Sequence, residues 1–335
     1  MSASLKGKVA IVTGSGQGIG RVVALAMAKE GAKVVTNNRK PDSTGFAIVN
    51  DSLIHSLSEE KQEWLRREAA AAKGDAETTA KAIRDSGGEA VSFFGDVSNY
   101  EIARQLIQKA VDNFGKIDIL VNVAGTFAFC PVWEATEEIW DHVNIKPKAH
   151  FNCIRHALPF MMQQNWGRII NCASGDFRGV GIRESCYTAA NAAVIGLTGA
   201  IAQELYPYGI TCNAFAPNAR TRASFELAAY EMANPADHGP WVDNNFKLPL
   251  ANSPSAEDIG PFICYLATEE AAGISGSLFY IGGKTVGLYA EAELKSTLTK
   301  YGGRWTIEEL KEQVPRALLS GYRSPAVLVS RNPAK

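Results

Sequence analysis

Glycines near the start of the chain have the spacing of a phosphate-binding turn. Gly14, Gly18 and Gly20 follow an apolar run at 8–12 and precede a helix-forming stretch that stops at Gly31. Such a turn directs backbone N–H groups and the positive end of a helix toward a diphosphate. The first glycine permits the tight turn, the second lets the backbone approach the phosphates, and the third allows close helix packing. The pattern predicts dinucleotide binding.

The elements around this turn alternate between short apolar runs and helix-like stretches. Strands are expected at 8–12, 33–36, 90–94, 117–121, 167–171, 210–215 and 278–281. Helices are expected after the glycine turn and at 75–86, 101–114, 136–164, 187–206 and 256–269. About seven strands alternating with about six helices indicate an α/β fold, a single doubly wound, Rossmann-type parallel sheet with helices on both faces. The expected domain spans residues 5–287.

Two segments are additional to these alternating strands and helices. Residues 40–74 form an insertion that contains a polar loop and an expected helix over 58–72. Residues 288–335 form a C-terminal extension with possible helices near 290–300 and 306–313. Both additions are expected to make oligomer contacts or to cover the domain rather than to do chemistry.

Composition excludes several classes of protein. The 34 Lys and Arg residues balance 35 Asp and Glu residues, which argues against a nucleic-acid or anionic-membrane partner. The apolar stretches are shorter than the ~18–20 residues that a membrane-spanning helix needs, and no secretory signal is expected. The six cysteines are scattered without a CxxC pair, so we expect reduced thiols, no metal site and a cytoplasmic protein.

Further motifs, in order along residues 5–287, resemble the short-chain dehydrogenase/reductase family. They are the glycine turn, Asp96-Val97, the Asn122–Gly125 stretch, and Ser174 with Tyr187 thirteen residues later. The 216–221 segment and the added segments are similar to a longer subgroup, the hydroxyacyl-CoA dehydrogenase part of peroxisomal multifunctional enzymes. The resemblance implies cofactor contacts from Gly14, Ser15, Gly18, Ile19, Gly20, Asn38, Arg39, Asp96, Val97, Asn122, Ala124, Gly125, Tyr187, Pro217 and Thr221.

The resemblance also implies a catalytic set that interconverts a carbonyl and a secondary alcohol. Tyr187 would exchange the proton, Ser174 would hydrogen-bond the substrate oxygen, and Asn144 would hold a relay water. A tyrosine pKa near 10 is too high for efficient proton transfer at neutral pH. The family places a lysine four residues after the tyrosine, which favours the tyrosinate and holds the nicotinamide ribose. In this chain that residue is Asn191.

The missing lysine leaves three explanations open. The enzyme is active with another base, or in the direction that needs a neutral tyrosine as the acid. A nearby cation replaces the charge, and Lys146 and Lys148 are the candidates. Alternatively, the chain is a catalytically impaired nucleotide-binding subunit of a hetero-oligomer. For an active enzyme the family resemblance implies a homotetramer or dimer.

The end of the second expected strand bears on the choice of cofactor. An acidic residue there would bind the ribose 2′-hydroxyl of NAD, whereas a cation accommodates the phosphate of NADP. The chain has Asn38 and then Arg39, whose planar guanidinium suits a phosphate. NADP(H) is therefore favoured over NAD(H), unless Arg39 and Lys40 are merely solvated loop charges.

The substrate is indicated only by its class. Phe127, Phe129, Phe177 and aromatic residues within 223–250 suggest an apolar substrate, although core packing would use them equally well. The subgroup resemblance implies a 3-oxoacyl or 3-hydroxyacyl thioester, and a simple ketone or secondary alcohol is the competing class.

Overall fold

Eight strands form one sheet in the computed structural model, which describes residues 4–42, 58–71, 73–179, 183–224 and 254–321. The strand order is β3-β2-β1-β4-β5-β6-β7-β8. The first seven pair in parallel, and β8 pairs antiparallel with β7. The strands are β1 (Val9–Val12), β2 (Lys33–Asn38), β3 (Ala90–Phe94), β4 (Ile119–Asn122), β5 (Gly167–Cys172), β6 (Ile210–Asn218), β7 (Leu278–Gly282) and β8 (Thr285–Leu288).

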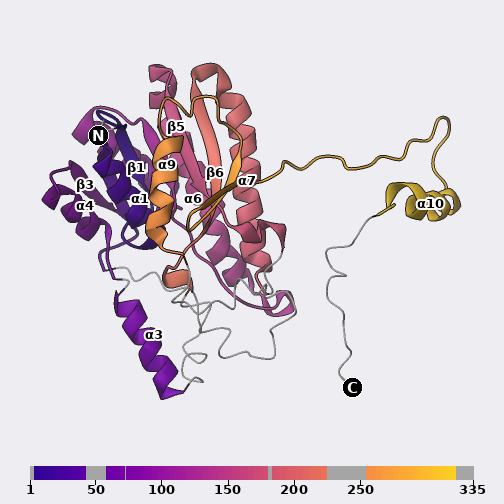
Figure 1. The fold of residues 1–335 in the computed structure, drawn as a ribbon, viewed down its shortest axis with the longest axis horizontal. Helices are drawn as coiled ribbons and strands as arrows, with labels where there is room; N and C mark the ends of the chain where they lie inside the picture. The colour runs from indigo at the N-terminus through magenta and orange to yellow at the C-terminus, as the bar shows by residue number, and fades with distance from the viewer. Residues whose placement is uncertain (1–3, 43–57, 72, 180–182, 225–253, 322–335) are drawn as a thin grey trace.

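Helices cover both faces of this sheet. One face carries α1 (Gly18–Lys29), α4 (Ala76–Asp85) and α9 (Gly260–Leu266), and the other carries α5 (Tyr100–Phe114), α6 (Glu137–Gln164) and α7 (Ser185–Leu205). Figure 1 shows α9 on the near face. Ala10 and Val12 of β1 enter the core under α1, while Val9 and Ile11 enter the core under α5 and α6. A strand that is buried on both faces has a continuous apolar sequence, and this pattern is the one from which β1 was predicted.

The expected α/β fold is confirmed, with one strand more than the seven that the apolar runs indicated. The additional strand β8 is exposed on both sides and contains Gly287, so its sequence lacks the apolar run that marks a buried strand. It ends at Leu288, one residue past the expected end of the domain.

The two additions extend away from the sheet in Figure 1. The insertion contains α3 (Glu59–Ala71), close to the expected 58–72. In the extension, α10 (Ile307–Gln313) begins with a capping box between Thr306 and Glu309. The helix expected near 290–300 is not formed, and most of that segment is exposed. A short helix without a packed face gains too little to offset the cost of nucleation.

By length and composition, Ser185–Tyr208 could cross a membrane, and it is the one described segment that could. In the fold this segment contains α7, which packs against α6 and β6. Val194, Ile201 and Leu205 are buried there, as expected for the core helix of a doubly wound domain.

Candidate active site

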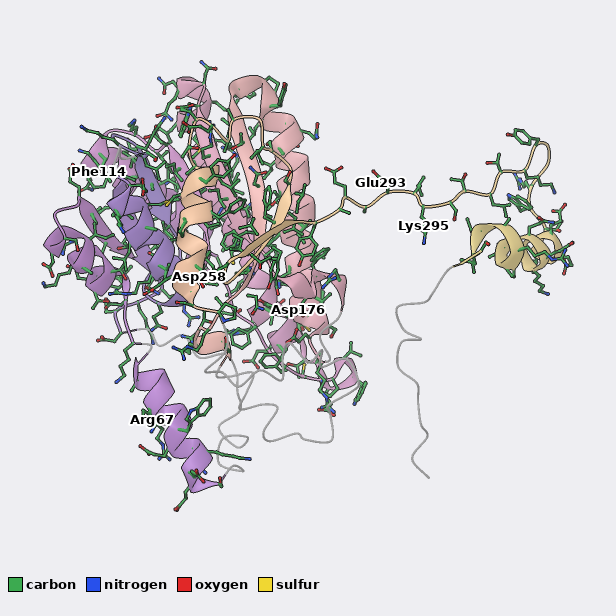
Figure 2. All side chains as sticks on the ribbon, in the orientation of Figure 1. Arg67, Phe114, Asp176, Asp258, Glu293 and Lys295 are labelled. Atoms are coloured by element: carbon green, nitrogen blue, oxygen red, sulfur yellow. The ribbon has the colours of Figure 1, made fainter. Side chains whose placement is uncertain are left out.

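A cavity of about 690 Å³ lies at the edge of the sheet where the parallel strands end. The glycine turn follows β1, Arg39 follows β2, Asp96 follows β3, Gly125 follows β4 and Ser174 follows β5, and all five positions line the cavity. Figure 2 labels Asp176 at this edge. Ligands of doubly wound sheets bind outside the carboxyl ends of the strands. The topology therefore brings together residues that are far apart in the sequence.

The glycine turn has the close backbone contacts that its sequence predicted. Gly14 has a φ of 63° and Gly18 a φ of 50°, values that favour glycine. A Cβ on Gly14 would lie 2.9 Å from the Ala124 backbone, and a Cβ on Gly20 would overlap the carbonyl of Gly14. Ile19 also lines the cavity. This bare backbone fits a dinucleotide diphosphate at the start of α1.

Ser15 lies beneath the turn rather than on its open side. Its side chain is fully buried and it is not among the lining residues. The backbone N–H of Asn37 donates to Ser15 Oγ at 2.8 Å, and the Ser15 N–H donates to the Asn37 carbonyl at 2.9 Å. In the structure, Ser15 therefore ties the glycine turn to the end of β2.

At the end of β2, Asn38 lies against the glycine turn, and its Oδ1 occupies the space that a Cβ on Gly16 would fill. This oxygen is buried and has no hydrogen-bond partner in the described residues, which fits a ribose nearby. Arg39 and Lys73 are exposed and line the same cavity. Lys73 was missed by the sequence analysis, because it belongs to the end of the insertion.

Contacts with the glycine turn hold that end of the insertion in place. Gln17 Nε2 donates to the Gly74 carbonyl at 3.0 Å. A Cβ on Gly16 would also overlap the backbone of Asp75. We expected the 40–74 insertion to make oligomer contacts or to cover the domain, and its last residue, Gly74, instead contacts the predicted cofactor turn.

The remaining predicted cofactor residues divide into lining and supporting groups. Asp96, Val97, Ala124, Gly125, Pro217 and Thr221 line the cavity. Asn122 is fully buried outside the lining, and its Nδ2 donates to Asn171 Oδ1 at 2.9 Å. The structure thus gives Asn122 a partner between two strands rather than a place on the cavity wall.

Ser174 and Tyr187 both line the cavity, together with Asp176, which the sequence analysis did not single out. Ser174 Oγ donates to Asp176 Oδ2 at 2.9 Å and accepts from the Asp176 N–H at 3.2 Å. Ser174 begins the short helix η2 (Gly175–Arg178), and this capping bond explains the position of the carboxylate. A hydroxyl–carboxylate pair therefore lies in the site.

Tyr187 lies near the start of α7, with its ring edge-on to Phe127 at a centroid distance of 6.3 Å. Burial raises the pKa of Tyr187, and the nearby Cys172 and Asp176 raise it as well. The hydrogen bond with Ser174 lowers the pKa of Tyr187. Such a tyrosine is a poor base unless a positive charge acts on it.

Of the two candidate cations, Lys146 reaches the site and Lys148 is exposed. Lys146 is 4% exposed, and its Nζ lies 5.5 Å from the centroid of the Tyr187 ring. The Nζ donates to Asn191 Oδ1 at 2.7 Å, and Asn191 Nδ2 donates to the Tyr187 carbonyl at 2.8 Å. Burial lowers the pKa of Lys146, whereas Cys172 and Asp176 raise it.

The structure does not bring Asn144 into this group. Its Nδ2 donates to the Trp140 carbonyl at 2.9 Å, and it is not among the lining residues. Asn144 and Lys146 are two positions apart on α6, which at 3.6 residues per turn places them about 200° apart around the axis. They therefore face opposite sides of the helix, and only Lys146 faces the site. Periodicity alone left the choice of face open.

The aromatic residues suggested for the substrate region are partly placed. Phe127 packs edge-on against Phe129 at 5.3 Å, and both line the cavity. Phe177 packs edge-on against Tyr289 at 5.4 Å, in the loop after β8. Of the 223–250 stretch, residues from 225 onward lie outside the described part of the chain.

Comparison with known proteins agrees with this geometry. A family model described as short chain dehydrogenase matches residues 8–49 and 64–225. The chain is 31% identical to a 3-oxoacyl-[acyl-carrier-protein] reductase of Synechocystis, over 84% of this chain and 98% of the relative. It is 33% identical to the peroxisomal multifunctional enzyme type 2 of Drosophila melanogaster, over 83% of this chain and 41% of the relative.

A solved structure has the same fold along nearly the whole chain. It is a short chain dehydrogenase from Mycobacterium avium, which superposes with a TM-score of 0.71 at 29% sequence identity. The match covers 96% of this chain and 97% of the other.

Proposed function

Because this chain belongs to the short-chain dehydrogenase family, we propose that it is an NAD(P)H-dependent oxidoreductase that interconverts a carbonyl and a secondary alcohol. The carrying observation is that Tyr187 and Ser174 lie on the wall of the same cavity as the glycine turn. That arrangement puts a proton donor and an oxygen-binding hydroxyl beside the place where the residues fit a dinucleotide.

The side chains of the site have separable tasks. The nicotinamide cofactor supplies or accepts the hydride when it is bound. Tyr187 gives its hydroxyl proton to the substrate oxygen during reduction and takes it back during oxidation. Ser174 can donate to one acceptor at a time, so its hydroxyl turns from Asp176 to the substrate oxygen as substrate binds.

The test is the Tyr187→Phe variant, with Tyr265→Phe as a control tyrosine on α9. We expect the first variant to lose turnover, assayed with 3-oxoacyl thioesters and simple ketones, while NADPH binding persists. The control keeps both properties. Turnover retained by Tyr187→Phe removes this residue from its role.

For the substrate, we favour a 3-oxoacyl or 3-hydroxyacyl thioester over a simple ketone or alcohol. Two observations support this class: the apolar wall made by Phe127 and Phe129, and the name of the Synechocystis relative, a 3-oxoacyl-[acyl-carrier-protein] reductase. The test compares kcat/KM for a 3-oxoacyl thioester with kcat/KM for a methyl ketone of equal chain length. A higher value for the ketone rejects the thioester.

For the cofactor, we favour NADP(H) over NAD(H). Asn38 replaces the acidic side chain that would repel a phosphate, and Arg39 and Lys73 line the cavity beside it. Both cations are exposed and able to turn toward a phosphate.

The alternative function is a catalytically impaired, nucleotide-binding subunit of a hetero-oligomer, and Asn191 is the observation that favours it. The isolated chain would then bind cofactor but turn over none of the substrates. Light scattering of the purified chain also tests the homotetramer or dimer that we propose for an active enzyme.

A further inference from the structure

Lys146 is a buried lysine whose hydrogen-bond partner is a neutral side chain. Its Nζ donates to the amide oxygen of Asn191, and the described residues supply no ion-pair partner for it. Burying an ammonium without a carboxylate carries a large desolvation penalty. A lysine in such a place indicates a use for its charge or for the N–H groups that Asn191 does not accept from.

The fold provides a channel for this side chain. Lys146 extends from α6 past Gly125, where a Cβ would lie only 2.9 Å from Lys146 Cδ and 3.0 Å from Cγ. Its ammonium then lies between the loop after β4 and the first turns of α7. Lys146 lines the cavity with Tyr187 and Ser174, whereas Asn191 is fully buried behind it.

We propose that Lys146 is the catalytic cation of this site and that Asn191 is the residue that positions it. The charge that other family members carry four residues after the tyrosine, on α7, is carried here by α6. One Nζ proton is donated to Asn191, and the other two are free to bind the nicotinamide ribose hydroxyls. The proposal rests on the oxidoreductase function given above.

The electrostatic consequence acts on Tyr187. The Lys146 Nζ lies 5.5 Å from the ring centroid, and a positive charge this close favours the tyrosinate and so lowers the pKa of Tyr187. Burial acts in the opposite direction, so the cation matters more here than it would at an exposed site.

Other titratable groups face the pair from each neighbouring element. Burial lowers the pKa of Lys146, and Cys172 on β5 and Asp176 on η2 act in the opposite direction, toward its charged form. Glu184, which precedes α7, raises the pKa of Tyr187 through its negative charge. His150, one turn along α6, is fully buried, and burial followed by the charge of Lys146 lowers its pKa to about 3. His150 is therefore neutral and does not compete with Lys146.

The experiment removes the lysine at position 146, adds a lysine at position 191, or exchanges the two side chains. These variants are, in that order, Lys146→Asn, Asn191→Lys, and the double variant Lys146→Asn with Asn191→Lys. We expect Lys146→Asn to lose at least about 100-fold in kcat/KM and about tenfold in NADPH affinity. Asn191→Lys puts two ammonium groups together and also loses activity. The double variant regains activity relative to both single variants.

The Lys146→Met variant is measured by its pH–rate profile. Methionine keeps most of the apolar chain of lysine, so this variant is less prone to misfold than Lys146→Asn. In the alcohol-oxidation direction its pH–rate profile shifts to higher pH, because the tyrosinate has lost its cation. Lys148→Met, on the exposed side of α6, is the matched control and leaves the profile in place.

Two outcomes overturn the proposal. In the first, Lys146→Met keeps the wild-type pH profile and NADPH affinity. In the second, the double variant is no better than the product of the single effects. Fluorescence titration with NADPH separates this proposal from the proposed function. If the wild-type chain binds NADPH but turns over nothing, the function fails, and the binding series still decides the role of Lys146. If the wild-type chain binds neither NADPH nor NADH, both fail.

Discussion

Gly125 and Lys146 share one space at the edge of the sheet, because the methylene chain of the lysine lies where a side chain on the glycine would be. The two residues come from different elements, the loop after β4 and α6. Because residue 125 has no Cβ, the side chain of Lys146 has room to reach the cavity.

Gly125→Ala is expected to displace Lys146. The added methyl would approach Cδ, Cγ and Cε of the lysine at 2.9–3.3 Å, and overpacking of this kind costs about 1–3 kcal/mol. We expect an activity loss of at least about tenfold, measured as kcat/KM, and a lower midpoint of urea unfolding. Gly196→Ala is the control, since a Cβ there meets nothing within 4 Å and lies in α7. Equal activities of the two variants would contradict the prediction.

Asp176→Asn is expected to move the pH profile in the direction opposite to that of Lys146→Met. The Asp176 carboxylate raises the pKa of Tyr187, because its negative charge opposes the tyrosinate. Removing that charge lowers the pKa of Tyr187, so alcohol oxidation gains activity at lower pH. The pH dependence of kcat is the measurement. A shift to higher pH would show that the carboxylate acts otherwise than by its charge.

Arg39→Ala and Lys73→Ala are expected to weaken NADPH binding by about tenfold each, or about 1.4 kcal/mol, and to change NADH binding little. Both cations line the cavity beside Asn38, where the extra phosphate would lie. Lys40→Ala is the control, because Lys40 is exposed and does not line the cavity. A tenfold preference of the wild-type chain for NADH would reject the NADP(H) proposal.

Asn122→Ala is expected to lower stability and to leave cofactor binding nearly unchanged. Loss of the Asn122 amide leaves Asn171 Oδ1 without its donor inside the core, which costs about 1–3 kcal/mol. Urea unfolding and NADPH titration measure the two effects separately. A large loss of NADPH affinity without a loss of stability would instead support a cofactor contact for Asn122.

Much of the fold was predictable because its signals are local. The buried strands are short apolar runs, and α4, α5 and α6 begin within a residue of their expected starts. Strand β8 and the coil near 290–300 were missed, because an exposed edge strand lacks an apolar run and helix propensity without packing is insufficient. Lys73 was missed because the sequence of a long insertion does not show which of its residues lie next to the glycine turn.

The sequence by itself predicted the glycine turn and the order of the elements, because both have local signals, and the family resemblance pointed to Ser174 and Tyr187. Only the tertiary structure decided that Lys146, rather than Asn144 or Lys148, meets Asn191. That choice depends on the rotation of α6 against α7 and on the gap at Gly125, which are set by packing between segments far apart in the chain. The proposal that α6 supplies the charge missing from α7 therefore rests on contacts across the fold, which the sequence alone does not give.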